Sequence, residues 1–411
     1  MGGSMIKKAL IWMLAAGCCI GSYATDARVI SMGKHDAFFM DEVSIFRNPA
    51  NINLYSNMVY GSYGVYKPDP ELDYNGTGNQ LGSLARTNRD PSDPFFGAII
   101  SYSMNQNTDD GNRFPMLSVG AVFNRKDRML DYVTKGTDKY LGKKNDEFLE
   151  PLGKVDLLMG YTFKNGGMIG GGVYAALQKH DSYRRLETTL YKGQIGMNWP
   201  IAKTMDMDIS LGGGMLTAIA DSAGYTKSRA NRDLFGTVEG RLFSKMAGLN
   251  GDFVPHARLD VMSFEKDNIY QMDVAAGIGL NLRIDKGFFW SGVEFLYGQK
   301  DSSNSTARES VGGRVSFGIE RSIWWDWFVI RVGGKKDLVY VTEGVDVGFL
   351  KENNPSDGSE DDLVGLGFGI NIENRLRIDV VAAEDIVYTF TNLFSGPQHH
   401  LFNRVSATYS F

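Results

Sequence analysis

Residues 364–373 read Val-Gly-Leu-Gly-Phe-Gly-Ile-Asn-Ile-Glu, so large apolar residues alternate strictly with small, polar or charged ones. Successive side chains of a β-strand point to opposite faces, and this pattern therefore predicts a strand with one apolar and one small or polar face. The stretch 273–285, Asp-Val-Ala-Ala-Gly-Ile-Gly-Leu-Asn-Leu-Arg-Ile-Asp, repeats the pattern. At about ten residues, such strands are longer than those of globular proteins, which usually have about five or six.

Sixteen stretches of this kind follow the first 56 residues of the chain. Short turns and long polar loops connect them in alternation, with turns at 164–167, 249–252 and 285–287 and loops at 67–93, 126–153, 221–233 and 342–362. Outer-membrane barrels have this arrangement, with the long loops outside the cell. We expect the strands to begin near Asn57, Pro94, Pro115, Lys154, Met168, Glu187, Asp206, Leu234, Phe253, Ile269, Phe288, Ser310, Trp327, Leu363, Arg377 and Leu401.

The pattern predicts an all-β fold, a transmembrane antiparallel β-barrel in the bacterial outer membrane. A short helix is expected in the loop 126–153, through Met129, Leu130 and Val133. The chain has 49 Gly among 411 residues, which suits a sheet with tight turns and close backbone contacts. Its 43 Lys and Arg against 48 Asp and Glu argue against a nucleic-acid partner.

The N-terminus has the features of a secretory signal peptide at 1–24. Lys7 and Lys8 precede the apolar stretch 9–21, and Ser22-Tyr23-Ala24 places small residues at the cleavage positions. That apolar stretch is shorter than the roughly 20 residues that a membrane-spanning helix needs. The alternative is a lipoprotein signal, because Leu14-Ala15-Ala16-Gly17 precedes a cysteine.

The chain has two cysteines, the adjacent Cys18 and Cys19, so cysteine cannot build a disulfide framework or a zinc site. Cleavage after Ala24 would leave a chain without cysteine. We predict three parts: the signal peptide at 1–24, an N-terminal plug segment at 25–56 and the barrel at 57–411.

Aromatic residues support the barrel. The tryptophans after the signal lie at or beside the predicted short turns, as expected of an aromatic girdle at one membrane interface; they are Trp199, Trp290, Trp324, Trp325 and Trp327. The alternative is that they cap the core of a soluble sandwich. The last strand places Val405, Ala407, Tyr409 and Phe411 on one face and Arg404, Ser406, Thr408 and Ser410 on the other. It resembles the C-terminal recognition strand of bacterial outer-membrane barrels.

A second resemblance lies between the signal and the first strand. The chain has Met32-Gly33, Ala37, Asp41-Glu42 and Asn48-Pro49-Ala50-Asn51-Ile52. This resembles the entry segment of the outer-membrane family that includes the long-chain fatty-acid transporters and the barrel component of the type IX secretion system. Asn51, Ile52 and Lys34-His35-Asp36 depart from the family pattern. The resemblance implies fourteen strands, whereas the alternation gives sixteen, so the prediction is 14 to 16.

The segment 25–56 is predicted to be a plug inside the barrel. Asn48-Pro49 favours a turn, with Ala50 completing the plug geometry. Charged and polar side chains make the segment too polar to face lipid, and a lumen can satisfy them; they are Arg28, His35, Asp36, Asp41, Glu42 and Arg47. The alternative is an ordered periplasmic tail.

Charged residues recur on the face opposite the apolar one in the second half of the chain. They are expected in the lumen, because Arg or Lys at the lipid midplane costs about 2–4 kcal/mol. Acids and arginines are nearly equal in number, so these residues either pair with one another and with the plug or line a wet, weakly selective conduit. They are Glu239, Arg241, Arg258, Asp260, Asp273, Arg283, Glu294, Arg314, Glu320, Arg331, Glu373, Arg377 and Asp379.

No catalytic residue, cofactor or metal site is predicted. His256, Asp260 and Ser263 lie on one predicted strand, and spacing alone makes no catalytic triad. His399 and His400 would point to opposite faces of an extended chain, which is poor geometry for a metal. The glycines do not follow a strand and open a helix, so they do not indicate nucleotide binding.

The sequence thus favours a non-enzymatic, monomeric barrel in contact with outer-membrane lipid. The first functional expectation is passive transport of small hydrophobic molecules across the outer membrane, which rests on the family resemblance and the plug. The second is a structural or secretion-associated barrel that binds a secreted or surface protein, as the secretion-system relatives imply.

Overall fold

A computed structural model describes residues 26–33, 35–55, 57–64, 94–102, 115–127, 129–130, 151–180, 185–222, 225–264, 269–302, 308–343, 346–349, 363–373, 375–382 and 402–411. The predicted signal peptide and most of the predicted loops 67–93 and 126–153 lie outside these residues. Among the described residues, no helix combines the length and the apolar character needed to cross a membrane.

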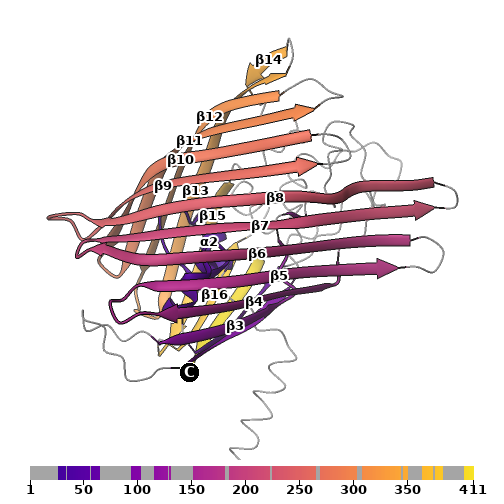
Figure 1. Ribbon diagram of the computed structural model, residues 1–411. Coiled ribbons are helices and arrows are strands. Elements are labelled where there is room, and N and C mark those ends of the chain that lie inside the picture. Colours follow the sequence, from indigo (N-terminus) through magenta and orange to yellow (C-terminus); the bar gives the residue numbers. More distant parts are fainter. Residues whose placement is uncertain are drawn as a thin grey trace, which may run out of the picture.

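Within the described ranges, seventeen antiparallel strands form one closed sheet, in which β1 pairs with both β2 and β17 (Figure 1). β14 and β15 pair with successive parts of β13, so the strands occupy sixteen positions around the barrel. The strands are β1 (Met58–Gly64), β2 (Phe95–Tyr102), β3 (Leu117–Phe123), β4 (Gly153–Thr162), β5 (Met168–His180), β6 (Arg185–Ala202), β7 (Met205–Ser222), β8 (Tyr225–Lys245), β9 (Gly251–Phe264), β10 (Ile269–Ile284), β11 (Gly287–Ser302), β12 (Arg308–Ser322), β13 (Phe328–Glu343), β14 (Asp346–Phe349), β15 (Leu363–Ile372), β16 (Leu376–Ala382) and β17 (Phe402–Ser410).

The predicted all-β barrel is confirmed, and its sixteen positions match the sixteen predicted stretches rather than the fourteen of the family pattern. Two predicted loops are wrong in part. Most of 221–233 is strand, because β7 runs to Ser222 and β8 begins at Tyr225. Likewise 342–362 contains the end of β13 and all of β14. Antiparallel pairing uses backbone groups, so polar residues on both faces do not prevent it beyond the apolar band. Figure 1 shows β5–β8 reaching further than their neighbours on this side.

The two faces of the sheet have the polarity that a barrel in hydrocarbon requires. Large apolar side chains on the outer face are exposed, among them Ile100, Met159 and Ile195, whereas charged side chains on the inner face, such as Asp208 and Glu294, are buried. This arrangement is the reverse of that in a soluble sandwich, whose outer face is polar. The observed faces therefore favour a lipid-facing exterior and a polar lumen.

The tryptophan prediction is correct for four residues and wrong for one. Trp324, Trp325 and Trp327 are exposed in the turn between β12 and β13, and the rings of Trp325 and Trp327 stack with centroids 5.3 Å apart. Trp199 packs against Phe163 beside a turn at the same end of the barrel. Trp290, however, is fully buried in the lumen. Trp290 lies two residues before Gly292 and therefore on the same inward face of β11, which explains why it is buried.

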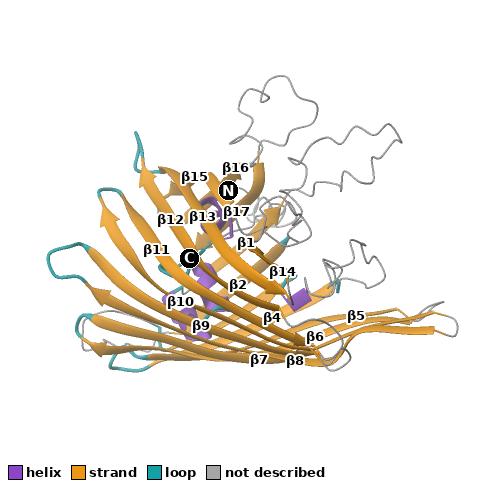
Figure 2. Cartoon of the chain, turned by 90° about the horizontal axis from the view of Figure 1, so that it is seen from above, coloured by secondary structure: helices purple, strands orange, loops and turns teal. Residues whose placement is uncertain are grey.

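Residues 26–33 and 35–55, here called the luminal segment, lie inside the barrel (Figure 2). They form the helix α2 (Asp26–Ser31) and the 3-10 helices η1 (Glu42–Phe46) and η2 (Pro49–Leu54). Asp41 begins η1 with a capping box that includes Ser44. Asn48 begins η2: its side-chain oxygen accepts a 3.0 Å hydrogen bond from the Ala50 amide, and Pro49 follows at the first helical position.

Candidate functional site

Glycines of the barrel wall form seats for the luminal segment. A Cβ at Gly196 of β6 would overlap the Asn48 side chain, and a Cβ at Gly170 of β5 would lie 2.5 Å from the Ala50 nitrogen. Asn48 also donates a 2.9 Å hydrogen bond from Nδ2 to the Met197 oxygen. A side chain at either glycine would push η2 away from the wall. These contacts place the predicted Asn48-Pro49-Ala50 turn against β5 and β6.

Another seat lies on β10 and β11. Gly279 and Gly292 are directly opposed residues of the two strands, and the ring of Phe38 occupies the space that a Cβ at either position would need. Phe38 is fully buried there, and so is Trp290 beside it. Directly after α2, the chain packs on β13, where a Cβ at Gly333 would lie 2.5 Å from the Met32 Cα. The high glycine content thus serves close packing in the lumen as well as turns.

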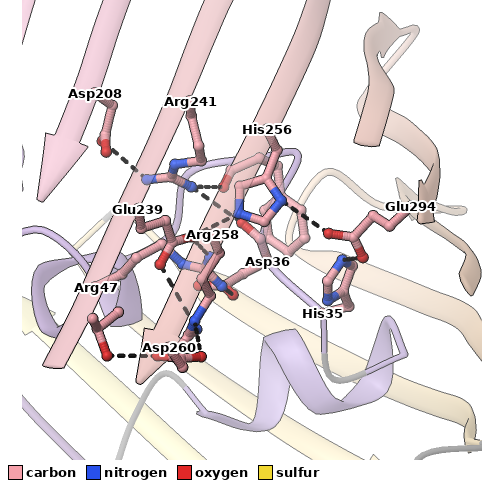
Figure 3. Close-up of polar contacts among 12 residues, drawn as sticks. His35, Asp36, Arg47, Asp208, Glu239, Arg241, His256, Arg258, Asp260 and Glu294 are labelled. Carbon is pink, nitrogen blue, oxygen red and sulfur yellow. Dashed lines mark hydrogen bonds and ion pairs between the residues drawn. The ribbon is translucent and has the colours of Figure 1, made fainter. Parts of the chain in front are cut away.

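A chain of alternating acids and bases joins the luminal segment to β8, β9 and β11 (Figure 3). His256 Nδ1 lies 2.9 Å from Glu294 Oε1, and its Nε2 lies 3.0 Å from Glu239 Oε1. His35 of the segment approaches the other oxygen of Glu294 at 2.9 Å. Arg47 of the segment contacts Glu239 and also Asp36. Glu294 and Glu239 therefore share His256 of the wall, and each also contacts one group of the segment, His35 and Arg47 respectively.

Arg241 of β8 holds the segment through the backbone. Its side chain is buried, and its NH1 donates 3.2 Å hydrogen bonds to the main-chain oxygens of Asp36 and Phe39. Its NH2 donates a 3.0 Å bond to Asp208, which also accepts a 2.9 Å bond from Asn51. One buried ion pair of the wall thus fixes the segment at two places.

A second ion-pair network holds the start of the segment. Arg28 donates bonds of 2.7 and 3.0 Å to the two oxygens of Glu320, and Arg28 NH1 lies 3.1 Å from Asp41. Arg331 contacts Glu320 and lies 2.8 Å from Asp379. Arg377 lies 3.0 Å from Asp379 and also contacts Glu42 of η1. The network therefore connects α2, η1 and three strands.

The pKa values of two carboxyl groups of the segment depend on the arginines around them. Burial by itself raises the pKa of Asp36, but Arg47 and Arg241 outweigh it and hold the pKa at about 2. Burial likewise raises the pKa of Glu42, and Arg377 and Arg28 overcome it, so the pKa lies below its ordinary value. Both carboxylates are therefore charged at neutral pH.

On the loop side, residues 125–127 and 129–130 enter the lumen. Arg125 donates bonds of 2.8 and 2.7 Å to Asp156 and lies over the Phe46 ring at 4.2 Å, while Asp127 lies 3.1 Å from Lys192. Met129 and Leu130 are helical, as predicted, and Val133 lies outside the described residues. The side chains of Met129 and Leu130 pack in an apolar cluster with Tyr174, Ala176, Leu190, Leu216 and Ala218.

Two cavities flank the luminal segment. The one on the turn side has a volume of about 730 Å³ and reaches Met40, Leu54, Asp206 and Arg283. The one on the loop side has about 310 Å³ and reaches Asp36, Phe46, Arg47, Arg125 and Lys192. Residues of the segment line both cavities, Met40 and Leu54 on the turn side and Asp36, Phe46 and Arg47 on the loop side.

The remaining predicted lumen charges divide into two groups. Arg258 lies 2.8 Å from Asp260, and Arg314 lies 2.6 Å from Asp337, both in the lumen. Glu373, in contrast, is an exposed residue of the turn between β15 and β16 with a φ of 53°, so it does not line the lumen. It directly follows the last residue of its strand, where strict alternation no longer fixes the face.

Several polar contacts in the lumen come from residues that the sequence did not single out, including Arg125, Asp156, Lys192, Asp208 and Asp337. The signal for Asp208 was available: it alternates with outward Ile209 and shares the face of buried Ser210. Among the described residues, no group of three or more histidine, cysteine, aspartate or glutamate side chains is arranged to hold a metal ion.

No protein-family model matches the chain, and no curated protein matches it. Several solved structures are similar to it at low level. The P. putida toluene transporter TodX has 10% identity and a TM-score of 0.36, over 95% of this chain and 99% of that one. The CymD monoaromatic hydrocarbon channel has 10% identity and a TM-score of 0.37, over 94% and 98%. BamA from Haemophilus ducreyi lacking POTRA domains 1-3 has 9% identity and a TM-score of 0.39, over 86% and 70%. At these scores the likenesses identify neither a family nor a function.

Proposed function

We propose that this protein is an outer-membrane barrel through which small hydrophobic molecules pass passively, with the luminal segment as its plug. The observation that carries the proposal is the position of that segment between two cavities of one closed barrel. A barrel that served only as a scaffold would need neither cavity. The resemblance of Met32-Gly33 and Asn48-Pro49-Ala50 to the entry segment of the fatty-acid transporter family supports the same role.

Apolar surface in the lumen supports a hydrophobic cargo. On the loop side, Tyr174, Leu190 and Leu216 face inward. Around the segment, a second cluster includes Ile45, Ile52 and Ile99, and a third includes Phe38, Phe39 and Trp290. Apolar groups leave water favourably, by about 25 cal/mol per Å² buried. Movement of the segment would uncover the second and third clusters to a solute arriving from either cavity.

The test combines uptake with a reversible tether. The predicted cleavage after Ala24 would leave a chain without native cysteine, so Asn51→Cys with Asn198→Cys introduces a pair of thiols where the two side chains of η2 and β6 are 3.0 Å apart. We expect a strain lacking the protein to take up a labelled aromatic or fatty compound more slowly than wild type. The tethered variant should behave like the deletion strain under oxidising conditions and recover when reduced. Gly193→Cys, on the outer face, is the control.

Equal uptake by wild-type and deletion strains would overturn the proposal. A tether that forms and leaves uptake unchanged would remove the plug role while keeping transport.

A structural or secretion-associated role is the second candidate, because ion pairs join the segment to the wall at several strands. It predicts that another protein copurifies stably from mild detergent. A lone, transport-active barrel in every preparation would exclude it.

A further inference from the structure

We infer that the seat of Phe38 and His35 is a binding site for an uncharged aromatic ring that carries one hydrogen-bond donor, as in phenols, indoles and anilines. Phe38 and His35 are the built-in occupants, and cargo replaces them when the segment moves. This inference rests on the proposed passage of hydrophobic molecules and names their chemical class.

The floor of the site fits one flat ring. Gly279 and Gly292 are opposed across β10 and β11, and one edge of the Phe38 ring lies over the first and the other edge over the second. Without side chains at these positions, the backbone forms a flat surface of ring width. A branched aliphatic group would contact such a floor less completely than a planar ring does.

Aromatic rings also form the sides of the site. His256 meets Phe38 edge to face, with centroids 6.1 Å apart and planes at 83°. Trp290 lies 6.4 Å from Phe38, and His35 lies 5.6 Å from it at 69°. Edge-to-face contacts favour aromatic partners because the positive ring edge meets the negative ring face. The wall half of this cage, His256 with Trp290, stays in place when the segment leaves.

Glu294, at the rim of the site, favours a ligand that carries a hydrogen-bond donor. Glu294 places one oxygen 2.9 Å from His256 and the other 2.9 Å from His35. When His35 leaves with the segment, the second oxygen keeps only Arg314, whose NH1 lies 3.7 Å away and beyond hydrogen-bond distance. A buried carboxylate oxygen without a hydrogen bond is costly. An O–H or N–H group on the cargo ring replaces the imidazole, whereas a carboxylate on the cargo would be repelled.

The test measures binding rather than transport. His35→Ala with Phe38→Ala empties the site, while Asn48 keeps its seat on Gly196 and Arg241 keeps its bond to the Phe39 oxygen. In the purified variant, we expect phenol and indole to bind at least about tenfold more tightly than toluene, as a hydrogen bond to a charged group implies. Benzoate should bind more weakly than toluene.

Two further variants keep the inference falsifiable. Gly292→Leu in the emptied background fills the floor and should abolish binding of all three ligands, whereas Gly193→Leu, which faces outward, should not. Glu294→Gln should remove the preference of phenol over toluene and leave toluene binding unchanged. Wild-type protein, in which Phe38 and His35 compete, should bind phenol more weakly than the emptied variant.

Equal binding of toluene and phenol, tighter binding of benzoate, or binding that survives Gly292→Leu would overturn the inference. None of these results depends on uptake. Failure of the ring site therefore leaves the proposed transport standing, and failure of transport in the deletion strain is recognised separately.

Discussion

Asn48 sits on Gly196, with its side-chain amide in the space where any other residue would carry a Cβ. The first plug residue predicted from the sequence and a glycine almost 150 positions later are thus complementary in shape. The fit between the segment and the wall can therefore be tested by single substitutions.

Gly196→Ala should loosen the segment. The added methyl overlaps the Asn48 amide, and overpacking of this kind typically costs about 1–3 kcal/mol. We expect faster amide exchange and faster proteolysis in residues 26–55, measured on folded barrels in detergent. Gly193→Ala on the same strand is the matched control, because nothing lies within 4 Å of the added atom. Identical exchange in the two variants would contradict the seat.

Arg241→Met should destabilise the barrel strongly. It leaves Asp208 charged and buried, and breaking a buried ion pair on one side typically costs about 3–5 kcal/mol. Urea unfolding in detergent measures the change. The double variant Arg241→Met with Asp208→Leu should be less damaging, since no buried charge is left alone. Arg321→Met, at an exposed pair with Asp285, should change stability by less than about 1 kcal/mol.

Acid should release the segment before the barrel unfolds. The pKa of Asp36 is about 2 in the folded protein and about 3.9 in an unfolded chain, so its stabilising effect is complete above pH 4 and is lost as the pH falls toward 2. Exchange or proteolysis of residues 26–55 should therefore rise over that range, with β-sheet circular dichroism unchanged. Asp36→Asn should show looser docking at neutral pH and a weaker response to acid. Acid-independent exchange in the wild type would contradict this assignment.

Tryptophan placement predicts opposite responses to brominated lipids. Trp324 is 81% exposed on the turn between β12 and β13, whereas Trp290 is 0% exposed in the lumen. In single-tryptophan variants reconstituted in bilayers, Trp324 should be quenched by bromine near the headgroups and Trp290 should not be quenched by bromine at any depth. Strong quenching of Trp290 would mean that β11 faces the other way.

The strands were predictable because their signal is local. Alternation over ten residues, as in 364–373, identifies a strand and its lipid face without knowledge of its neighbours. The signal fails where both faces are polar, which is why the strand residues of 221–233 read as a loop. The alternation also has to be followed along the whole strand. Gly292 and Glu294 of β11 face inward, so Trp290, which has the same place in the alternation, faces inward too.

The contacts of the site were less accessible. Alternation along each strand shows which charged residues face inward. The pairing of Arg47 with Glu239, which lie 192 positions apart, depends on how a separate segment packs in the closed lumen. The glycine seats belong to the same class, because a glycine on an inward face indicates space without saying what fills it. Only the closed sheet brings Phe38 to Gly279 and Gly292.

The luminal segment touches both ends of the strand order, since α2 contacts β13 and β15–β17 while η2 contacts β3–β6. Its seats therefore come together only when the last strand has joined the first. The segment precedes every described strand in the sequence, yet it reaches its final place only at the end of assembly. Its docking marks a barrel that has closed correctly, and an assembly intermediate with an open seam would leave these residues outside.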